Sequence, residues 1–314
     1  MPIGIDLGGT KIAGIRMADD GCVLSENRIA TPKNDYRATL DAIVELVTSL
    51  DGGEDMPIGI GTPGACVPGL QIMQNCNSEW LNGKRLLPDL ETRLGKRVRM
   101  ANDADCFALS EAHFGAGRGY TSVFGVILGT GVGGGFVVEG RLLSGPNALT
   151  GEWGHTPLPY FRQRSREAFR EDEHVNELLD ALECALSPRT CYCGRLNCIE
   201  TFLSGPGLAR THESLWGDAR TPEELAAALD DEARKTFDLY CHMLARSLAQ
   251  VVNIVDPHVI VLGGGLSKID RLYPRLSDLI ARYTFSGRCK TPILAPVGGD
   301  ASGVRGAAWV WLDA

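Results

Sequence analysis

IGIDLGGTKIAGIRM, residues Ile3–Met17, consists of an apolar strand, a turn rich in glycine and threonine, and a second apolar strand. The segment Phe124–Val138, FGVILGTGVGGGFVV, follows the same plan. This internal repeat predicts two related lobes. Neither turn has the Walker form, and neither leads into a helix as a dinucleotide fingerprint does. Each turn on its own is open to two interpretations, an ordinary glycine hairpin or a loop that binds phosphate.

The repeat favours phosphate binding. Glycine lets backbone N–H groups approach an anion, and threonine adds hydroxyl donors. Two such turns facing each other could hold an oligophosphate between the lobes. A third glycine group, in PHVIVLGGGLS at Pro257–Ser267, ends a buried strand and is expected to begin a helix. That position suits a nucleotide near a helix N-terminus, and a flexible joint is the alternative.

Strands and helices alternate along the chain. A helix is expected around Leu40–Leu50, where apolar residues follow the i, i+3, i+4, i+7 spacing and Asn34 or Asp35 can act as the cap. A longer helix is expected from about 232 to 254, before Pro257. The predicted strands are Ile3–Leu7, Ile12–Met17, Cys22–Ile29, Ile58–Ile60, Val98–Ala101, Val123–Leu128, Gly135–Glu139 and Val259–Leu262. This alternation predicts the α/β class.

Composition excludes several classes of protein. The 314 residues are 44% hydrophobic and 22% charged, and no apolar run reaches the roughly 18 residues of a membrane span. The net charge of −8 and the absence of a basic cluster argue against nucleic acid as a partner. The chain starts with a strand-like segment, without the features of a signal peptide, so a cytoplasmic location and no contact with a membrane are expected.

Three cysteines are concentrated in TCYCGRLNCIETF, Thr190–Phe202, directly before Glu200. In a reducing compartment, such a group indicates metal binding or catalysis more often than a disulfide knot. The C-x-C-x₄-C spacing is tighter than that of most zinc sites. Metal ligands, buried thiols and a redox pair therefore all remain open on spacing alone.

Seven motifs occur in an order that resembles the ROK family of sugar kinases and repressors. They are GIDLGGTK, GTPG, NDAD, LGTGVGGG, GEWGH, CYCGRLNCIE and VLGGGLS. The resemblance implies a two-lobed actin-like (ribonuclease H-like) ATPase fold of the hexokinase type, with ATP and sugar meeting in the cleft between the lobes. It places a small lobe at 1–118 with a C-terminal helix at about 300–314, and a large lobe at 119–299. It also implies a homodimer.

The resemblance assigns the glycine loops to Mg·ATP. A carboxylate at Asp6 could reach Mg²⁺ on the phosphates, directly or through water. Lys11 could contact the phosphates or be a solvated surface lysine. The implied ATP-binding residues are Asp6, Gly8, Gly9, Thr10, Lys11, Thr130, Gly131, Gly133, Gly134, Gly264 and Gly265.

Asp103 is the predicted catalytic base. A sugar kinase needs a group that orients the hydroxyl and accepts its proton, and a carboxylate is adequate because the proton leaves late. The pair Asn102 and Asp103 could instead cap a helix. Asp105 stands where the family usually has Asn and is the second candidate for the base. The implied sugar ligands are Asn77, Asn102, Glu152, His155 and Glu200.

The resemblance also selects the metal interpretation of the cysteines. His155, Cys191, Cys193 and Cys198 would form a closed Cys₃His zinc site. A charged insertion at about 160–189, expected to be helical, separates His155 from the cysteines, and His174 or Cys184 within it could compete as a ligand. Asn197 stands where the family usually has Gly, and Asn tolerates the left-handed backbone that such a turn needs.

The expected reaction is ATP-dependent phosphorylation of a hexose at the 6-hydroxyl. The motifs NSEWLNG, GEWGHTPLP and CYCG with CIETFLSG look most like bacterial fructokinase, so D-fructose is the predicted substrate, with mannose as a second. The alternative is a glucokinase or an N-acetylhexosamine kinase of the same family. A ROK repressor is disfavoured because it needs a helix-turn-helix ahead of the first phosphate loop, which begins here by residue 6.

Overall fold

The computed structural model describes residues 1–52, 55–159, 177 and 188–311, and the chain divides into two compact units. Unit 1 comprises Met1–Gly125, Gly134–Gly151 and Pro296–Ala314, and unit 2 comprises Val126–Gly133 and Glu152–Ala295. Most of the predicted insertion at 160–189 lies outside the described residues, as do His174 and Cys184. None of the described helices is long and apolar enough to cross a membrane.

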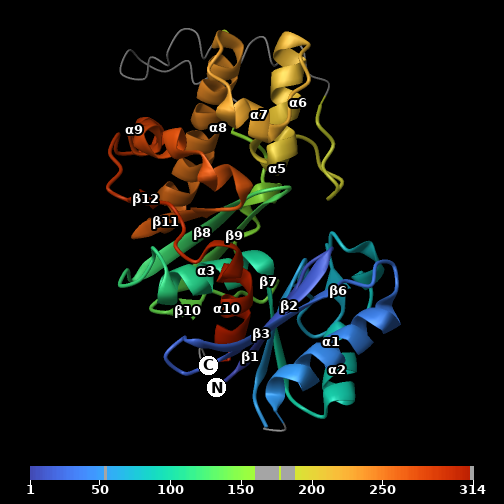
Figure 1. Ribbon diagram of the computed structural model, residues 1–314. Coiled ribbons are helices and arrows are strands. Elements are labelled where there is room, and N and C mark those ends of the chain that lie inside the picture. Colours follow the sequence, from blue (N-terminus) through green and yellow to red (C-terminus); the bar gives the residue numbers. More distant parts are fainter. Residues whose placement is uncertain (53–54, 160–176, 178–187, 312–314) are drawn as a thin grey trace. The chain divides into compact units, whose positions relative to one another are not determined.

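The first sheet belongs to unit 1 and has the strand order β3-β2-β1-β4-β7 (Figure 1). Its strands are β1 (Ile3–Leu7), β2 (Lys11–Met17), β3 (Val23–Ala30), β4 (Ile58–Thr62) and β7 (Val98–Asn102). β1, β2 and β3 pair antiparallel, whereas β1, β4 and β7 pair parallel. The first glycine turn therefore joins two neighbouring antiparallel strands. A short ribbon of β5 (Ala65–Cys66) and β6 (Met73–Gln74) precedes a single 3₁₀ turn at Glu79–Leu81.

Helices lie on both faces of the first sheet (Figure 1). They are α1 (Tyr36–Asp51), α2 (Leu86–Leu94), α3 (Asp103–Phe114) and α10 (Ser302–Trp309). Asp35 caps α1, since its carboxylate accepts the Ala38 N–H at 3.0 Å. On the other face α10 comes close to the backbone of the sheet: a Cβ at Gly59 would lie 1.9 Å from the Ala307 carbonyl oxygen. Glycine is therefore required where α10 packs on β4.

A buried carboxylate joins α3 to the C-terminal part of unit 1. Glu111 is fully buried and accepts four hydrogen bonds at 2.9–3.1 Å. The donors are the N–H groups of Ala116, Val297 and Gly298 and the hydroxyl of Ser302. Because a buried charge is tolerated only when it is fully hydrogen-bonded, this network determines the path of the chain into α10.

The Glu111→Gln variant is expected to lose about 3 kcal/mol of unfolding free energy. Glutamine has nearly the same shape, but its NH₂ group would face backbone donors that now contact a carboxylate oxygen. Urea unfolding followed by circular dichroism measures this loss. Glu45→Gln, on the exposed side of α1, is the matched control and should change stability by less than about 0.5 kcal/mol. Equal stability of the two variants would contradict the role given to Glu111.

The second sheet has the strand order β10-β9-β8-β11-β12 (Figure 1). Its strands are β8 (Ser122–Leu128), β9 (Val132–Val138), β10 (Arg141–Leu142), β11 (Val259–Gly263) and β12 (Ile293–Leu294). Two of the four boundaries between the units fall within β8 and β9, and the other two follow Gly151 and Ala295. β9 starts three residues before the predicted Gly135 and so includes Gly133 and Gly134.

The described α-helices of unit 2 all lie in the second half of the chain. They are α5 (Glu200–Leu203), α6 (Gly205–Trp216), α7 (Pro222–Ala227), α8 (Asp231–Val255) and α9 (Tyr273–Tyr283). The prediction of a helix directly after the third glycine group is wrong, because Gly265–Lys268 forms one 3₁₀ turn and Asp270–Leu272 forms another. Gly264 there has φ of +81°, and its backbone lies against Leu128 of β8. This close approach explains glycine at that position.

Candidate functional site

Unit 1 has a cavity of about 360 Å³ beside the first glycine turn. It is lined by Asp6, Leu7, Gly8, Gly9, Lys33, Pro63, Asn77, Ser78, Trp80 and Asp103. The structure therefore brings together the predicted phosphate loop, the predicted sugar ligand Asn77 and the predicted base Asp103. Thr10, Lys11 and Asn102 are not among the lining residues.

Asp103 starts α3 at the carboxyl end of β7 and is exposed in the unit 1 cavity. One of its carboxylate oxygens accepts the Ala104 N–H at 2.8 Å. Asn102 is the N-cap of the helix and accepts the Asp105 N–H at 2.6 Å. The side-chain oxygen of Asn102 therefore has a structural partner, whereas Asp103 faces a cavity. Asp105 is partly buried and lies against Gly135.

The first glycine loop is held by a threonine that sequence reasoning did not identify. The Thr31 hydroxyl donates to the Gly8 carbonyl oxygen at 2.7 Å. Asp6 lies at the start of this loop, where burial raises the pKa of its carboxyl and the charge of Lys11 partly opposes that rise. Lys33, two residues after Thr31, lines the cavity that Lys11 does not. In the sequence Lys33 follows a strand in a polar turn and resembles any surface lysine.

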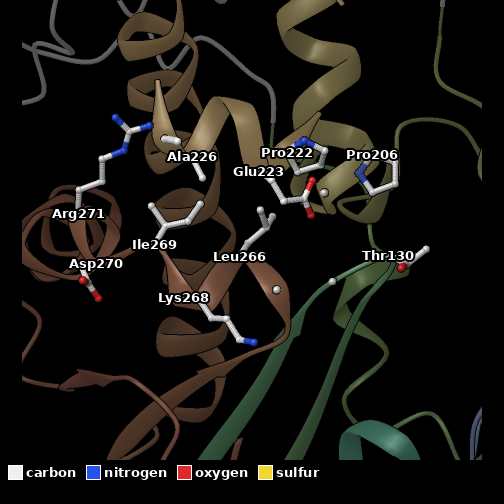
Figure 2. Close-up of a pocket in the computed structure, with 14 residues that line it drawn as sticks. Thr130, Pro206, Pro222, Glu223, Ala226, Leu266, Lys268, Ile269, Asp270 and Arg271 are labelled. Carbon is white, nitrogen blue, oxygen red and sulfur yellow. The ribbon is translucent and has the colours of Figure 1, made fainter. Parts of the chain in front are cut away.

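Unit 2 has a larger cavity of about 920 Å³ beside the second glycine turn (Figure 2). Its lining residues are Gly129, Thr130, Gly205, Pro206, Pro222, Glu223, Ala226, Ala227, Gly265, Leu266, Lys268, Ile269, Asp270 and Arg271. Of the predicted ATP-binding residues of unit 2, Thr130 and Gly265 line it, and Gly131, Gly133 and Gly264 do not. Gly134 belongs to unit 1 and does not line it either. Much of the wall comes from α7 and the start of α6, which sequence reasoning did not connect with the glycine loops.

Apolar and cationic groups share the unit 2 cavity. Leu266, Ile269 and Ala226 provide apolar surface of the kind that contacts an aromatic base. Lys268 is an exposed cation at the edge of the cavity. The Arg271 guanidinium is instead held in place, since it donates to the carbonyl oxygens of Leu225 and Ala228. Arg271 thereby ties the carboxyl end of α7 to the wall of the cavity.

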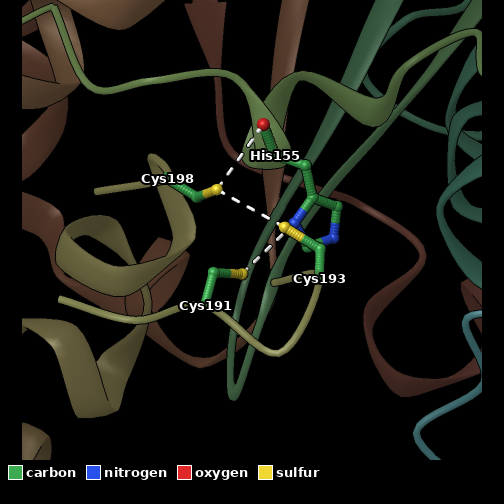
Figure 3. Close-up of side chains that lie close together, drawn as sticks. All are labelled: His155, Cys191, Cys193 and Cys198. Carbon is green, nitrogen blue, oxygen red and sulfur yellow. Dashed lines mark hydrogen bonds between the residues drawn. The ribbon is translucent and has the colours of Figure 1, made fainter. Parts of the chain in front are cut away.

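Four potential metal ligands meet in unit 2, and they are the four residues that the family resemblance implied (Figure 3). The ligand atoms of His155, Cys191, Cys193 and Cys198 all lie within 4.8 Å of one another. The Sγ atoms of Cys193 and Cys198 are 3.6 Å apart, and Cys191 Sγ is 3.5 Å from His155 Nδ1. Ligands at zinc bond lengths of about 2.0–2.3 Å in a tetrahedron are separated by roughly 3.5–3.8 Å. The residues therefore fit zinc.

The backbone around this cluster is ordered by its own hydrogen bonds. Asn197 has φ of +57°, as predicted for the residue in place of glycine, and its N–H donates to the Arg189 carbonyl oxygen at 2.8 Å. Residues Pro157 and Cys198 form an isolated β-bridge. Burial raises the pKa of the Cys198 thiol to about 12, which favours the neutral thiol in the absence of metal. A bound cation would act in the opposite direction and favour the thiolate.

The predicted sugar ligands of unit 2 surround the cluster. His155 directs Nδ1 at Cys191, and its Nε2 is 2.9 Å from the Tyr192 hydroxyl and 4.0 Å from a Glu152 carboxylate oxygen. Burial raises the pKa of the Glu152 carboxyl, with an opposing effect from His155. Glu200 accepts the Val132 N–H at 3.0 Å and so joins the cluster to the second glycine turn. Tyr192 was not predicted, because nothing in the sequence places its hydroxyl on His155.

The model of the ROK family matches residues 2–314. The chain belongs to the ROK family. It is 37% identical over 318 residues to the N-acetyl-D-glucosamine kinase of Pasteurella multocida, with 100% of each chain covered, and equally similar to that of Escherichia coli O6:H1, with 99% of each covered.

Solved structures give the same result for the fold. The ROK hexokinase from Thermus thermophilus matches with a TM-score of 0.81 and 28% identity, covering 99% of this chain and 98% of that one. A ROK glucokinase from Streptomyces griseus in complex with glucose and AMPPNP matches with a TM-score of 0.71 and 26% identity, covering 98% and 97%. The predicted α/β fold of the actin-like, hexokinase type and the predicted resemblance to ROK sugar kinases are confirmed.

Proposed function

We propose that this ROK protein is a kinase that transfers the γ-phosphoryl group of ATP to the 6-hydroxyl of N-acetyl-D-glucosamine. The observation that carries the proposal is the 37% identity, over the whole chain, to N-acetyl-D-glucosamine kinases from two different genera. The predicted preference for fructose has no comparable support. The predicted alternative, an N-acetylhexosamine kinase, therefore replaces fructokinase as the main hypothesis.

Asp103 is proposed as the base. Its exposed carboxylate in the unit 1 cavity can accept a hydrogen bond from the sugar hydroxyl and take the proton as the phosphoryl group moves. The Asn102 cap and the Ala104 N–H hold Asp103 at the first turn of α3. The N-terminal end of a helix favours the ionised carboxylate, which is the form that accepts a proton.

Each unit has a cavity beside a glycine turn, and both turns are proposed as nucleotide-binding elements. The backbone of Gly8 and Gly9 would contact phosphate, and Asp6 would hold Mg²⁺. When bound, Mg²⁺ neutralises charge on the phosphates. The unit 2 cavity of about 920 Å³ would take the adenosine, with Thr130 and Gly265 at its wall.

Zinc is proposed at the Cys₃His cluster. His155, Cys191, Cys193 and Cys198 supply four ligands, which closes the coordination shell and gives the metal a structural role.

Glu152, His155 and Glu200 are proposed as ligands of sugar hydroxyls. A polar group that is paired with one hydroxyl discriminates against sugars that lack it, because the group is then left unpaired. The predicted homodimer stays a prediction, which light scattering can check.

The substrate proposal is tested by an assay of ADP release with a panel of sugars. N-acetylglucosamine should give a kcat/KM at least about tenfold above those of N-acetylmannosamine, glucose, mannose and fructose, which corresponds to about 1.4 kcal/mol of transition-state discrimination. Phosphorus NMR of the product should place the phosphate at the 6-position. A kcat/KM for fructose or glucose equal to that for N-acetylglucosamine would contradict the assignment.

A further inference from the structure

We propose that His212, Asp218 and Glu232 form a second metal site in unit 2, which binds a divalent transition-metal cation of the zinc type. His212 lies in the last turns of α6, Asp218 follows that helix, and Glu232 lies in the first turn of α8. One ligand atom from each residue lies within 4.8 Å of the other two. None of these residues belongs to the Cys₃His cluster or lines a cavity described above.

The imidazole of His212 is oriented for metal binding. Its side chain is 0% exposed, and its Nδ1 lies 2.9 Å from the Thr236 hydroxyl oxygen. That hydroxyl donates its proton to the Glu232 carbonyl oxygen and accepts the Trp216 indole N–H. Because the hydroxyl has one proton, His212 Nδ1 is the donor of their shared hydrogen bond. This assignment leaves the lone pair of neutral His212 on Nε2.

The Nε2 atom of His212 has no hydrogen-bond partner, although it is buried. It points toward Asp218, whose carboxylate oxygen is 3.6 Å away. A neutral imidazole would direct its lone pair at a negative carboxylate, which is unfavourable. A cation held by His212 Nε2 and the Asp218 carboxylate would use the lone pair of the imidazole, while the carboxylate keeps its bond from Arg220. Thr236 would then serve as the group that fixes the tautomer of a metal-ligating histidine.

The donor set and its exposure select the class of metal. One imidazole and two carboxylates suit Zn²⁺ and similar first-row cations, and three protein ligands leave a position for water. Asp218 and Glu232 are reached by solvent, so a metal can enter although His212 is buried. Arg220 Nε donates at 2.6 Å to Asp218 Oδ2, the same oxygen that lies 3.6 Å from His212 Nε2. The metal would therefore bind the other oxygen of Asp218 or share Oδ2 with the guanidinium, which also pairs with Asp230.

The site would act on the wall of the unit 2 cavity. The chain between Asp218 and Glu232 contains α7, and Pro222, Glu223, Ala226 and Ala227 of this segment line the cavity. A cation bound at both ends of the segment would restrict the segment and favour one position of α7. If the cavity takes adenosine, as proposed above, metal binding and nucleotide binding then strengthen each other by linkage.

Metal content tests the site independently of kinase activity. Metal-stripped protein is dialysed against buffered micromolar Zn²⁺ and analysed by mass spectrometry of the metal. The double variant Asp218→Asn/Glu232→Gln should carry one equivalent less zinc than the control Glu213→Gln, whose exposed side chain neighbours His212 on α6. Substituting Co²⁺ should give a second component that lacks the thiolate charge-transfer bands of the Cys₃His site.

The alternative is a histidinium paired with Asp218 and no metal. It predicts equal zinc content in the double variant and the control, and that result would overturn the proposal. Circular dichroism and the urea midpoint show whether the double variant folds, and His212→Gln provides a second test if it does not. The ADP affinity of the control should rise about threefold with zinc, and that of the double variant should not change. Loss of this effect with zinc content intact would count against the nucleotide assignment of the cavity and leave the metal site in place.

Discussion

Asp103→Asn should lower kcat about 1000-fold and leave the affinity for sugar and nucleotide within about threefold of wild type. Asparagine has the shape of aspartate and can still receive the Ala104 N–H, so α3 should begin at the same residue. The amide cannot take the proton of the sugar hydroxyl. The loss should therefore appear in the chemical step, which rapid-quench measurement of a single turnover isolates.

Asp105→Asn is the matched control. Asp105 is in the same first turn of α3 and carries the same charge, but it is partly buried and does not line the unit 1 cavity. A fall in kcat of less than about tenfold is expected, because the charge near the site changes and the proton acceptor does not. If Asp105→Asn lowered kcat as much as Asp103→Asn, the assignment of the base would have to move from Asp103 to Asp105.

Elements determined by local pattern were predicted closely. β1 has the predicted bounds, and the Asp35 cap of α1 was one of two residues named. β9 was predicted three residues short, because Gly133 and Gly134 have low strand propensity and the neighbouring strands of the sheet override it. The prediction of a helix directly after the third glycine group was wrong, because Gly264 has φ of +81° and the chain passes through two 3₁₀ turns before α9 begins at Tyr273.

The site could be predicted only where the residues that share it also share a motif. The C-x-C-x₄-C spacing drew attention to the three cysteines but left their role open, and the structure brings His155 from another segment to them, as the family resemblance implied. Lys33, Tyr192 and the α7 wall of the unit 2 cavity come from tertiary packing, which leaves no periodic signal in the chain. The same holds for Glu111, whose partners lie up to 191 residues away.

Cys198→Ser should raise the Kd for sugar about 30-fold, equivalent to about 2 kcal/mol, and change the Kd for AMPPNP by less than about threefold. A substitution is preferable to a chelator here, because a chelator would also strip the cation proposed at His212. Losing one of four ligands should release zinc or loosen it, as metal analysis will show. Isothermal titration of each ligand alone measures the two affinities.

The difference between the two affinities follows from what the cluster holds. Zinc would fix His155 and the turn before Glu200, and both residues are proposed sugar ligands, with Glu152 beside them. None of the four ligands lines the unit 2 cavity, so nucleotide binding has no direct dependence on the metal.

Cys289→Ser is the control, since Cys289 is a partly buried cysteine of unit 2 outside the cluster. It should leave zinc content and both affinities unchanged. Equal weakening of sugar and nucleotide binding in Cys198→Ser would mean that zinc stabilises unit 2 as a whole. An unchanged Kd for sugar in a zinc-free variant would separate the metal from the substrate. Only a selective loss of sugar affinity supports the arrangement in which the cysteine cluster holds the residues that bind sugar.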